Sequence, residues 1–234
     1  MRLNSFLLIV TIIFSLIASS CQKELNPVIS PNIIYQSNFK QNQDGWQADI
    51  ADYSTQQQDI QFESGWSALP SPLDSTRKSI RVSSMNRSDD LFMFLKKKIS
   101  GLQVNAEYKL VFDIELASAY ATNSIGIGGS PGGSVYLKAG ATATEPTKVL
   151  KNGFYSINLD KGNQSTGGKD ATLLGNIGAG DDVTSYKLIT RSNADAPLTV
   201  RTNAQGELWL VVGTDSGYEG LTTLYYSTIK VTAK

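Results

Sequence analysis

The chain has 234 residues, of which 41% are hydrophobic and 18% are charged, a composition that can bury a core and differs from that of a disordered segment. Its 21 basic residues balance 21 acidic ones, so it lacks the basic excess that binding to nucleic acid or to an anionic membrane surface requires. It has no histidine and one cysteine, which excludes Ser-His-Asp and Cys-His catalysis, imidazole-ligated zinc or copper, and an internal disulfide.

The N-terminal segment has the pattern of an export signal. Arg2 precedes an apolar run over residues 6–17 that is too short to span a bilayer, and three small residues then lead to Cys21. This pattern resembles the bacterial lipobox, which implies cleavage before Cys21 and acylation of that cysteine. By resemblance to the sorting rule of enteric bacteria, Gln22 rather than aspartate at the next position implies the outer membrane. The alternative is an ordinary secretory signal with an incidental cysteine.

Three segments are therefore expected along the chain. Residues 1–20 form the signal peptide, residues 21–31 a lipidated tether with two prolines, and residues 32–234 a single domain. Each buried acyl CH2 contributes about 0.8 kcal/mol, so several chains on one cysteine can hold this domain on a membrane without a spanning helix.

The sequence of the domain predicts short strands separated by clusters of Gly, Asn, Asp and Ser. The clearest strand covers residues 108–116, where apolar and mainly polar residues alternate as on a half-solvated antiparallel sheet. We expect further strands over residues 33–39, 46–53, 59–63, 79–83, 91–99, 134–140, 154–159, 186–190, 198–202, 208–212 and 222–231. About a dozen strands without helical crossovers predict an all-β fold, an antiparallel β-sandwich, most simply a galactose-binding-like jelly roll.

Two terminal segments resemble those of the jelly-roll sandwiches of carbohydrate-binding modules. They are FKQNQDGW at residues 39–46 and LYYSTIKV at residues 224–231. This resemblance implies that the first and last strands pair. Further segments, at residues 88–94, 127–132, 135–141, 159–165 and 212–220, are similar to an uncharacterised family of secreted bacterial proteins and lipoproteins, a resemblance that implies no catalytic residue.

The loop DKGNQSTGGKD at residues 160–170 concentrates oxygen donors and glycines at the end of a strand. It has three interpretations: a structural turn, a clamp for sugar hydroxyls that uses Asp160, Lys161 and Asn163, or a calcium loop. It is not an EF-hand, because Gly162 and Ser165 occupy positions where that loop requires a ligand and a glycine.

The loop GTDSGYEG at residues 213–220 follows an apolar strand that must lie in the centre of a sheet. We expect Asp215, Tyr218 and Glu219 to project at the rim, where a tyrosine ring can stack on a sugar and the carboxylates can accept hydroxyl hydrogen bonds. A solvated hairpin loop is the alternative. The glycine-rich residues 126–133 predict a turn or bulge, since the spacing of a nucleotide-binding loop is absent.

Asp89 and Asp90 are adjacent carboxylates, which implies solvent exposure, a cation partner such as Lys138, Lys161 or Arg87, or a hard metal. The three lysines at residues 96–98 are expected at a solvated strand end or a protected sheet edge. Of the three tryptophans, Trp209 is expected in the core, whereas Trp46 and Trp66 are either core residues or binding platforms.

Three functions follow. The first is a non-catalytic module that binds a glycan-type ligand, with no cofactor except an optional calcium ion, through Asp89, Asp90, Lys138, Asp160, Lys161, Asn163, Asp215, Tyr218 and Glu219. The second is a glycan-cleaving enzyme that uses carboxylates such as Asp215 and Glu219, or a Lys or Tyr base, and it predicts two carboxyl groups about 5 to 10 Å apart in a cleft. The third is an assembly lipoprotein with an extended complementary patch and no small ligand.

Overall fold

The structure is a computed structural model that describes residues 32–88 and 90–234. The expected signal peptide, the lipidation site at Cys21, the tether and the candidate Asp89 lie outside the described residues. In the described part, no helix is long and apolar enough to cross a membrane.

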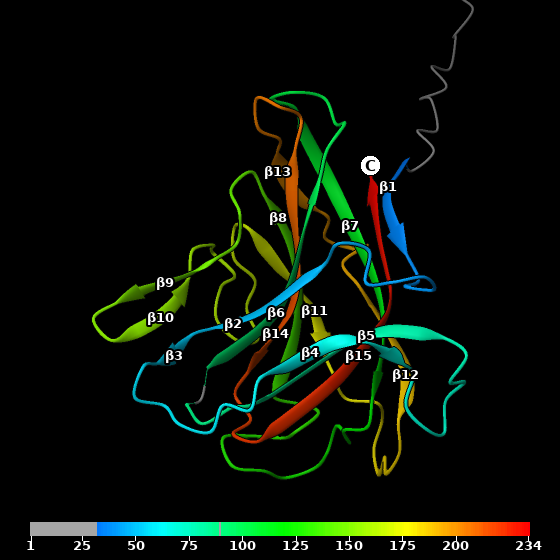
Figure 1. Cartoon of the computed structure of the whole chain (residues 1–234), viewed down its shortest axis with the longest axis vertical. Helices are drawn as coiled ribbons and strands as arrows, with labels where there is room; N and C mark the ends of the chain where they lie inside the picture. The colour runs from blue at the N-terminus through cyan, green and yellow to red at the C-terminus, as the bar shows by residue number, and fades with distance from the viewer. Residues whose placement is uncertain (1–31, 89) are drawn as a thin grey trace, which may run out of the picture.

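Two antiparallel sheets pack face to face, which confirms the predicted antiparallel β-sandwich (Figure 1). The seven-stranded sheet has the order β12 (Lys187–Ser192), β7 (Glu107–Ser118), β15 (Leu221–Ala233), β5 (Lys78–Met85) and β4 (Glu63–Ala68), with β1 (Asn32–Ser37) on β15 and β13 (Leu198–Arg201) on β7. The five-stranded sheet has the order β11 (Ala171–Asn176), β8 (Val135–Thr142), β14 (Leu208–Ser216), β6 (Leu91–Ile99) and β2 (Gln47–Ala51). From β5 to β8, successive strands alternate between the two sheets, as in a jelly roll.

The first and last strands of the domain pair, as the resemblance to carbohydrate-binding modules implied. β1 lies antiparallel to the end of β15, with Asn32 opposite Ala233 and Ser37 opposite Ile229 (Figure 1). A third, small sheet of three strands comprises β3 (Tyr53–Ser54), β10 (Phe154–Ile157) and β9 (Lys148–Lys151).

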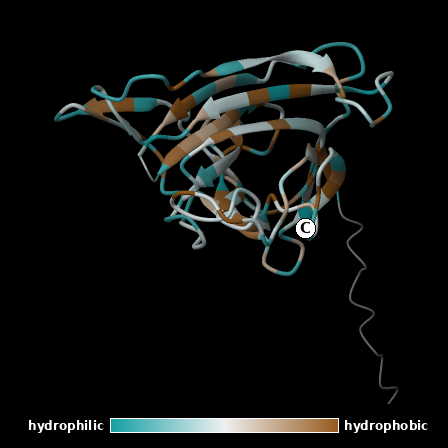
Figure 2. Cartoon of the chain, turned by 90° about the horizontal axis from the view of Figure 1, so that it is seen from below, coloured by the Kyte–Doolittle hydropathy of each residue, from teal (hydrophilic) through white to brown (hydrophobic). Residues whose placement is uncertain are grey.

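The main core lies between the two large sheets and is built from the alternating pattern that the sequence shows. On β7, Leu110, Phe112, Ile114 and Leu116 are fully buried in this core. Hydrophobic and hydrophilic positions alternate along the strands in Figure 2. Because strand side chains alternate between faces, an apolar residue at every second position commits one face of each sheet to the core.

Most predicted strands are confirmed, and the exceptions have local causes. Residues 59–62 form no strand, because Asp59 and Gln61 have positive φ angles of 61° and 48°; the strand begins at Glu63 instead. β9 and β11 were not predicted. The missed β9 has a clear signal: Asn152 and Gly153, with φ of 53° and 77°, form the type of two-residue turn that joins hairpin strands.

Candidate functional site

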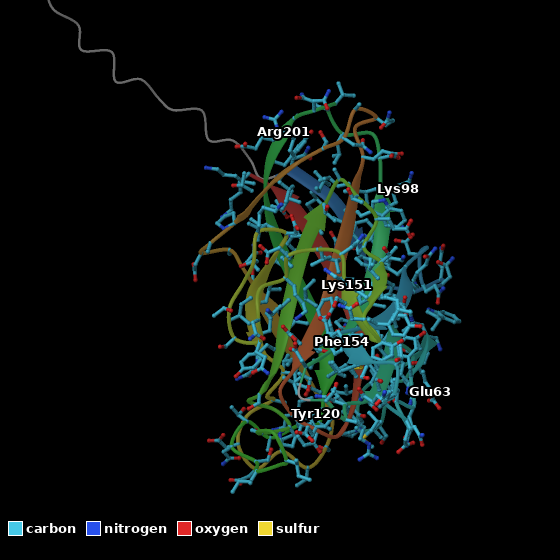
Figure 3. The ribbon with its side chains drawn as sticks, turned by 90° about the vertical axis from the view of Figure 1, so that its left-hand side faces the viewer. Glu63, Lys98, Tyr120, Lys151, Phe154 and Arg201 are labelled. Carbon is cyan, nitrogen blue, oxygen red and sulfur yellow. The ribbon has the colours of Figure 1, made fainter. Side chains whose placement is uncertain are left out.

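The outer face of the five-stranded sheet, which points away from the main core, is partly covered by residues 143–170, which we call the covering segment. Its Ile157 and Leu159 pack on the sheet, whereas Val149, Leu150 and Phe154 stay exposed. A second apolar cluster fills this contact and consists of Ala51, Phe92, Phe94, Leu159, Ala171 and Val211, with Ile157 packed against it. Figure 3 looks at this side of the molecule, with Lys151 and Phe154 of the covering segment in front of the strands. The outward-facing residues of β14 from Val211 to Asp215 are therefore buried on this side as well, which makes this part of β14 doubly buried, as predicted.

Five charged side chains gather beside this second cluster, and we call them the ionic cluster: Asp52, Asp90, Lys138, Lys161 and Asp215. Lys138 of β8 and Asp215 of β14 have side chains with no solvent exposure. Oδ2 of Asp215 accepts hydrogen bonds from Lys161 Nζ at 2.8 Å and from the backbone N–H of Gln164 at 2.8 Å, and it lies 3.1 Å from Lys138 Nζ.

Asp52 connects the ionic cluster to the small three-stranded sheet. It has a φ of 62° between β2 and β3, a backbone conformation that aspartate tolerates better than most residues. Its Oδ1 accepts the N–H of Ile157 at 3.1 Å, and its Oδ2 lies 3.2 Å from Lys161 Nζ. Burial raises the pKa of Asp52, although the charge of Lys161 opposes this shift.

Asp90, which directly precedes β6, is a member of the ionic cluster whose pKa is raised. Its pKa is raised to about 6: burial raises it most, the charge of Lys161 opposes this shift, and the carboxyl groups of Asp215 and Asp52 add to it. Oδ1 of Asp90 and Oδ1 of Asp215 have no hydrogen-bond donor among the described residues. A hydrogen bond between the Asp90 and Asp215 carboxyl groups needs a proton on one of them, which would satisfy both.

The acidic loop that the sequence singled out, residues 160–170 of the covering segment, is shaped by the carboxylate of Asp160. Oδ1 of Asp160 accepts the N–H of Gly162 at 3.0 Å, and Oδ2 accepts the N–H of Lys169 at 3.0 Å. These backbone hydrogen bonds lower the pKa of Asp160. Gly162 has a φ of 69°, and a Cβ on Gly168 would lie 2.2 Å from Asp160 Oδ1, so the loop needs glycine at both positions. This geometry is that of the structural turn among the three predicted interpretations.

A hollow of about 300 Å³ opens beside the ionic cluster. Asp52, Asp90, Lys161 and Asn163 line one part of it, and Phe154 and Ser156 of β10 line another. The Phe154 side chain is 37% exposed. The hollow therefore combines an accessible aromatic ring with several charged and amide groups, which is the mixture that recognises sugars and other polar ligands with apolar faces.

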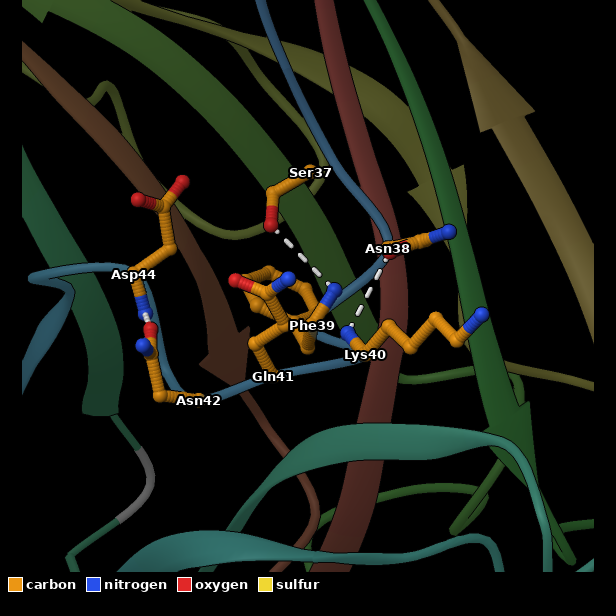
Figure 4. Close-up of a pocket in the computed structure, with 7 residues that line it drawn as sticks. All are labelled: Ser37, Asn38, Phe39, Lys40, Gln41, Asn42 and Asp44. Atoms are coloured by element: carbon orange, nitrogen blue, oxygen red, sulfur yellow. Dashed lines mark hydrogen bonds between the residues drawn. The ribbon is translucent and has the colours of Figure 1, made fainter.

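A second hollow, of about 270 Å³, lies at the turn formed by residues 37–44 (Figure 4). Its polar groups mainly serve the turn itself: Asn38 Oδ1 accepts the N–H of Lys40 at 3.2 Å, and Asn42 Oδ1 accepts the N–H of Asp44 at 2.6 Å. Because these side chains already bond their own backbone, the first hollow is the stronger candidate site.

Within residues 32–88 and 90–234, no group of three or more Asp, Glu or Cys residues is arranged to hold a metal ion. The oxygens of Asp160, the first position of the predicted calcium loop, already accept backbone hydrogen bonds.

The structure brings together most of the site residues that the sequence suggested. The expected exposure of Asp215, and that of Tyr218 and Glu219, was wrong. Asp90, Asp160, Lys161 and Asn163 line the same hollow, and Asp90 has Lys161 as a cation neighbour, as expected. Asp215 does not project at the rim of its strand: it belongs to β14 and is fully buried beneath the covering segment.

Tyr218 and Glu219 were also expected at an exposed rim beside Asp215, and the structure corrects this expectation. The Tyr218 side chain is partly buried against the main core, and a Cβ on Gly126 would lie 2.5 Å from its ring. The N–H of Glu219 donates to the carbonyl of Ile127 at 2.9 Å, and neither residue lines the hollow. The glycine-rich residues 126–133 form turns, as predicted.

Two further expectations need correction. The three lysines at residues 96–98 lie toward the end of β6, and Lys98 is exposed, as expected for a solvated strand end. Lys96 departs from this expectation: it lies between β14 and β2, is buried, and donates to Glu145 Oε1 at 2.6 Å. Trp209 is only partly buried, and Lys96 Nζ lies 5.7 Å from its ring centroid. Trp46 is a core residue with 1% exposure.

Sequence reasoning missed Asp52, Phe154 and Ser156 as parts of the hollow. Phe154 follows the hairpin turn at Asn152 and Gly153, which would have placed it on an exposed hairpin. Asp52 carries no comparable local signal, because its role depends on Lys161, more than a hundred residues later in the chain.

No protein-family model matches the chain, and no curated protein matches it either. Its fold is similar to that of several solved structures. One is the xylanase 10B CBM22-1 and GH10 modules of Clostridium thermocellum with xylohexaose, at 12% identity and a TM-score of 0.42 over 88% of this chain, which spans 29% of the xylanase chain.

A second is the mannan-recognising carbohydrate-binding module TmCBM27, at 11% identity and a TM-score of 0.43, covering 88% of this chain and 99% of that one. A third is the K1 cleaved adhesin domain of Lys-gingipain from Porphyromonas gingivalis W83, at 10% identity and a TM-score of 0.35, covering 86% of this chain and 96% of that one.

The similarity is to a β-sandwich like that of carbohydrate-binding modules. The fold assignment itself rests on the strand pairing described above. The finer resemblance, to an uncharacterised family of secreted proteins, stays a prediction.

Proposed function

We propose that this protein is an exported, lipid-anchored module that binds a glycan-type ligand without catalysing its cleavage. The observation that carries the proposal is the hollow beside the ionic cluster, where the exposed ring of Phe154 faces the same space as Asp90, Lys161 and Asn163. Sugar rings present apolar faces that stack on an aromatic side chain, and hydroxyl groups that pair with carboxylates, ammonium groups and amides.

The electrostatics favour a neutral ligand over an anionic one. Four carboxyl groups, those of Asp52, Asp90, Asp160 and Asp215, lie in or directly behind the hollow, against the two ammonium groups of Lys138 and Lys161. The resulting negative excess repels uronate or sulfate groups, since like charges in a partly desolvated site cost free energy. A neutral polysaccharide meets no such repulsion.

The enzyme alternative receives less support from the same residues. Asp215 is fully buried and engaged by two lysines and a backbone N–H, and Glu219 does not line the hollow, so this pair does not form the expected cleft. The assembly alternative is kept as an outcome of the binding test.

The test is isothermal titration of the purified protein with neutral and acidic polysaccharides. Phe154→Ala should weaken binding of a neutral glycan by about fivefold, because stacking on an aromatic ring contributes on the order of 1 kcal/mol. The matched control is Trp66→Ala, which removes a ring that is 43% exposed on β4 of the other sheet and should leave affinity unchanged. Absence of binding to any glycan would favour the assembly role, and sensitivity to Trp66 instead of Phe154 would place the site elsewhere.

The anchor is tested separately from ligand binding. Cys21→Ala should move the protein from the outer-membrane fraction to the soluble fraction of the producing bacterium, since the acyl chains supply the membrane affinity. A variant that stays in the membrane fraction would contradict the lipid anchor while leaving the binding proposal intact.

A further inference from the structure

The small three-stranded sheet has one face that continues the wall of the hollow beside the ionic cluster. Phe154 and Ser156 of β10 line that hollow, and as alternate residues of one strand they point to the same face of the sheet. On the neighbouring strand β9, Lys151 is opposite Phe154 and Val149 is opposite Ser156. Directly opposite residues share a face, so Val149 and Lys151 extend this wall by one strand.

This face, which we call the platform, consists of Val149, Lys151, Phe154 and Ser156 and is open to solvent. All four residues are exposed, Phe154 by 37% and Val149 by 49%. Figure 3 shows Lys151 and Phe154 on this side of the molecule. On β3, Ser54 is opposite Phe154 and adds a hydroxyl group to the same face. The platform therefore presents apolar surface together with hydroxyl and ammonium groups.

The hairpin also has an exposed apolar residue on its other face. Leu150 is 54% exposed and lies opposite Tyr155, whose ring centroid is 5.0 Å from that of Tyr53. Lys148 Nζ lies 5.7 Å from the centroid of the Tyr155 ring. None of these four described residues lines the hollow. Leu150 is thus as accessible as Val149 but lies on the face away from the platform.

The hollow by itself is small for a polysaccharide ligand. Its volume of about 300 Å³ is at the lower end of the range of about 300 to 1,000 Å³ that is typical of ligand pockets. A longer glycan must therefore extend beyond it, and the platform is the exposed surface that continues its wall. Neighbouring strands lie about 4.8 Å apart, close to the length of one sugar unit, so a chain that passes over Phe154 meets Val149 one unit later.

We propose that the ligand is a glycan chain whose inner units occupy the hollow and whose next unit lies on the platform, where Val149 and Lys151 form an outer subsite. This inference rests on the proposed glycan-binding function and adds the length of the ligand and the side on which it leaves the hollow. The apolar face of the outer unit covers the methyl groups of Val149, and its hydroxyl groups accept hydrogen bonds from the ammonium group of Lys151.

The position of β9 in the small sheet favours a long chain over a chain end. Among the described strands, β9 pairs only with β10 and is the edge of the sheet. A chain that crosses Val149 therefore continues into solvent, and the site requires no free sugar terminus on this side.

The test is isothermal titration of the protein with neutral gluco-, xylo- and manno-oligosaccharides, from disaccharide to hexasaccharide. In a series that binds, the tetrasaccharide should bind about fivefold more tightly than the disaccharide, as expected when a longer chain covers part of an exposed valine side chain. Val149→Ser should remove most of this gain and leave the affinity for the disaccharide unchanged. Affinity that does not depend on length in the wild type would overturn the outer subsite, whereas the Phe154→Ala effect would still support the proposed function.

The matched control is Leu150→Ser, which removes an equally exposed side chain from the opposite face of the same strand and should leave both affinities unchanged. Equal losses in the two serine variants would overturn the subsite, because they would arise from a weakened hairpin.

Val149→Tyr tests the subsite by a gain that loss of folding cannot produce. Its ring offers a stacking surface, so it should strengthen binding of the tetrasaccharide by about threefold or more and leave the disaccharide unaffected. Unchanged or weaker binding of the tetrasaccharide would overturn the subsite. If no oligosaccharide of any length binds the wild type, the proposed function and this inference are both wrong.

Discussion

The two faces of β14 are both buried, but they are buried by different means. On the inner face, Leu208, Leu210 and Val212 pack in the main core and are fully buried among other apolar side chains. On the outer face, Val211 packs in the second apolar cluster, and Asp215 enters the ionic cluster beneath residues 143–170. One strand thus contacts a mainly apolar, uncharged interior on one side, where Thr214 and Ser216 are the buried polar residues, and a partly ionic one on the other.

This difference predicts which substitutions each face of β14 tolerates. An apolar interior requires the right volume, and many hydrophobic sequences supply it. A buried charge requires a specific partner, and removing that partner leaves a charge with neither water nor a counterion. The inner face should therefore accept substitutions of equal volume, whereas the outer face should reject even isosteric ones that change charge.

The largest effect is expected for Asp215→Ala. This substitution takes the carboxylate from Lys138 and Lys161 and should lower the free energy of unfolding by about 3 to 5 kcal/mol. Urea unfolding followed by circular dichroism measures it. The matched control is Glu63→Ala, which removes the exposed partner of Arg81 on β4 and should cost less than about 1 kcal/mol. Equal losses in the two variants would show that the ionic cluster is as solvated as a surface pair.

The next effect is expected for Leu210→Ala on the inner face of the same strand. Leu210 is fully buried, so its truncation should lower the free energy of unfolding by about 2 to 4 kcal/mol through lost burial and a cavity. Two conservative substitutions test the difference between the two faces of β14 more directly. Leu210→Met should cost less than about 1.5 kcal/mol, whereas the isosteric Asp215→Asn should cost more than that. The reverse order would refute the distinction between the two faces.

The smallest predicted effect is a pH-dependent change in thermal stability caused by Asp90. Its pKa is raised from 3.8 to about 6 in the folded state, so the stability that its protonation contributes is complete below about pH 3.8 and is lost as the pH rises through about 6. Asp90→Asn stays neutral at every pH. Relative to the wild type, its unfolding midpoint should rise by about 2 to 4 °C between pH 4.5 and 7.5, which corresponds to about 1 kcal/mol after allowance for solvent screening.

Thermal unfolding at these two pH values measures the Asp90 effect. The quantity to compare is the change with pH in the difference between the unfolding midpoints of the variant and the wild type. A difference that is constant or falls with pH would show that Asp90 is not desolvated by the covering segment.

Much of the fold could be predicted because strand alternation is a local property. The pattern of β7, from Leu110 to Leu116, identifies the buried face without knowledge of its neighbours. The candidate site was predicted only in part. The acidic loop at Asp160 was found because its composition is unusual. The assignment of Asp215 to an exposed rim was wrong, because the residues near Asp215 in the sequence do not indicate that two distant lysines contact it.

The sequence by itself determined the antiparallel sandwich, the apolar core and the expectation of export, because periodicity, turn residues and a signal-like N-terminus are encoded by neighbouring residues. Only the tertiary structure determines which charged side chains contact one another. Asp52, Lys138, Lys161 and Asp215 come from four separate strands or loops. The pairing of β8 with β14 brings Lys138 to Asp215, and the folding of residues 143–170 over the five-stranded sheet adds Lys161, which contacts Asp52 and Asp215. Burial removes water from these side chains, which raises the pKa of Asp52 and lowers that of Lys138.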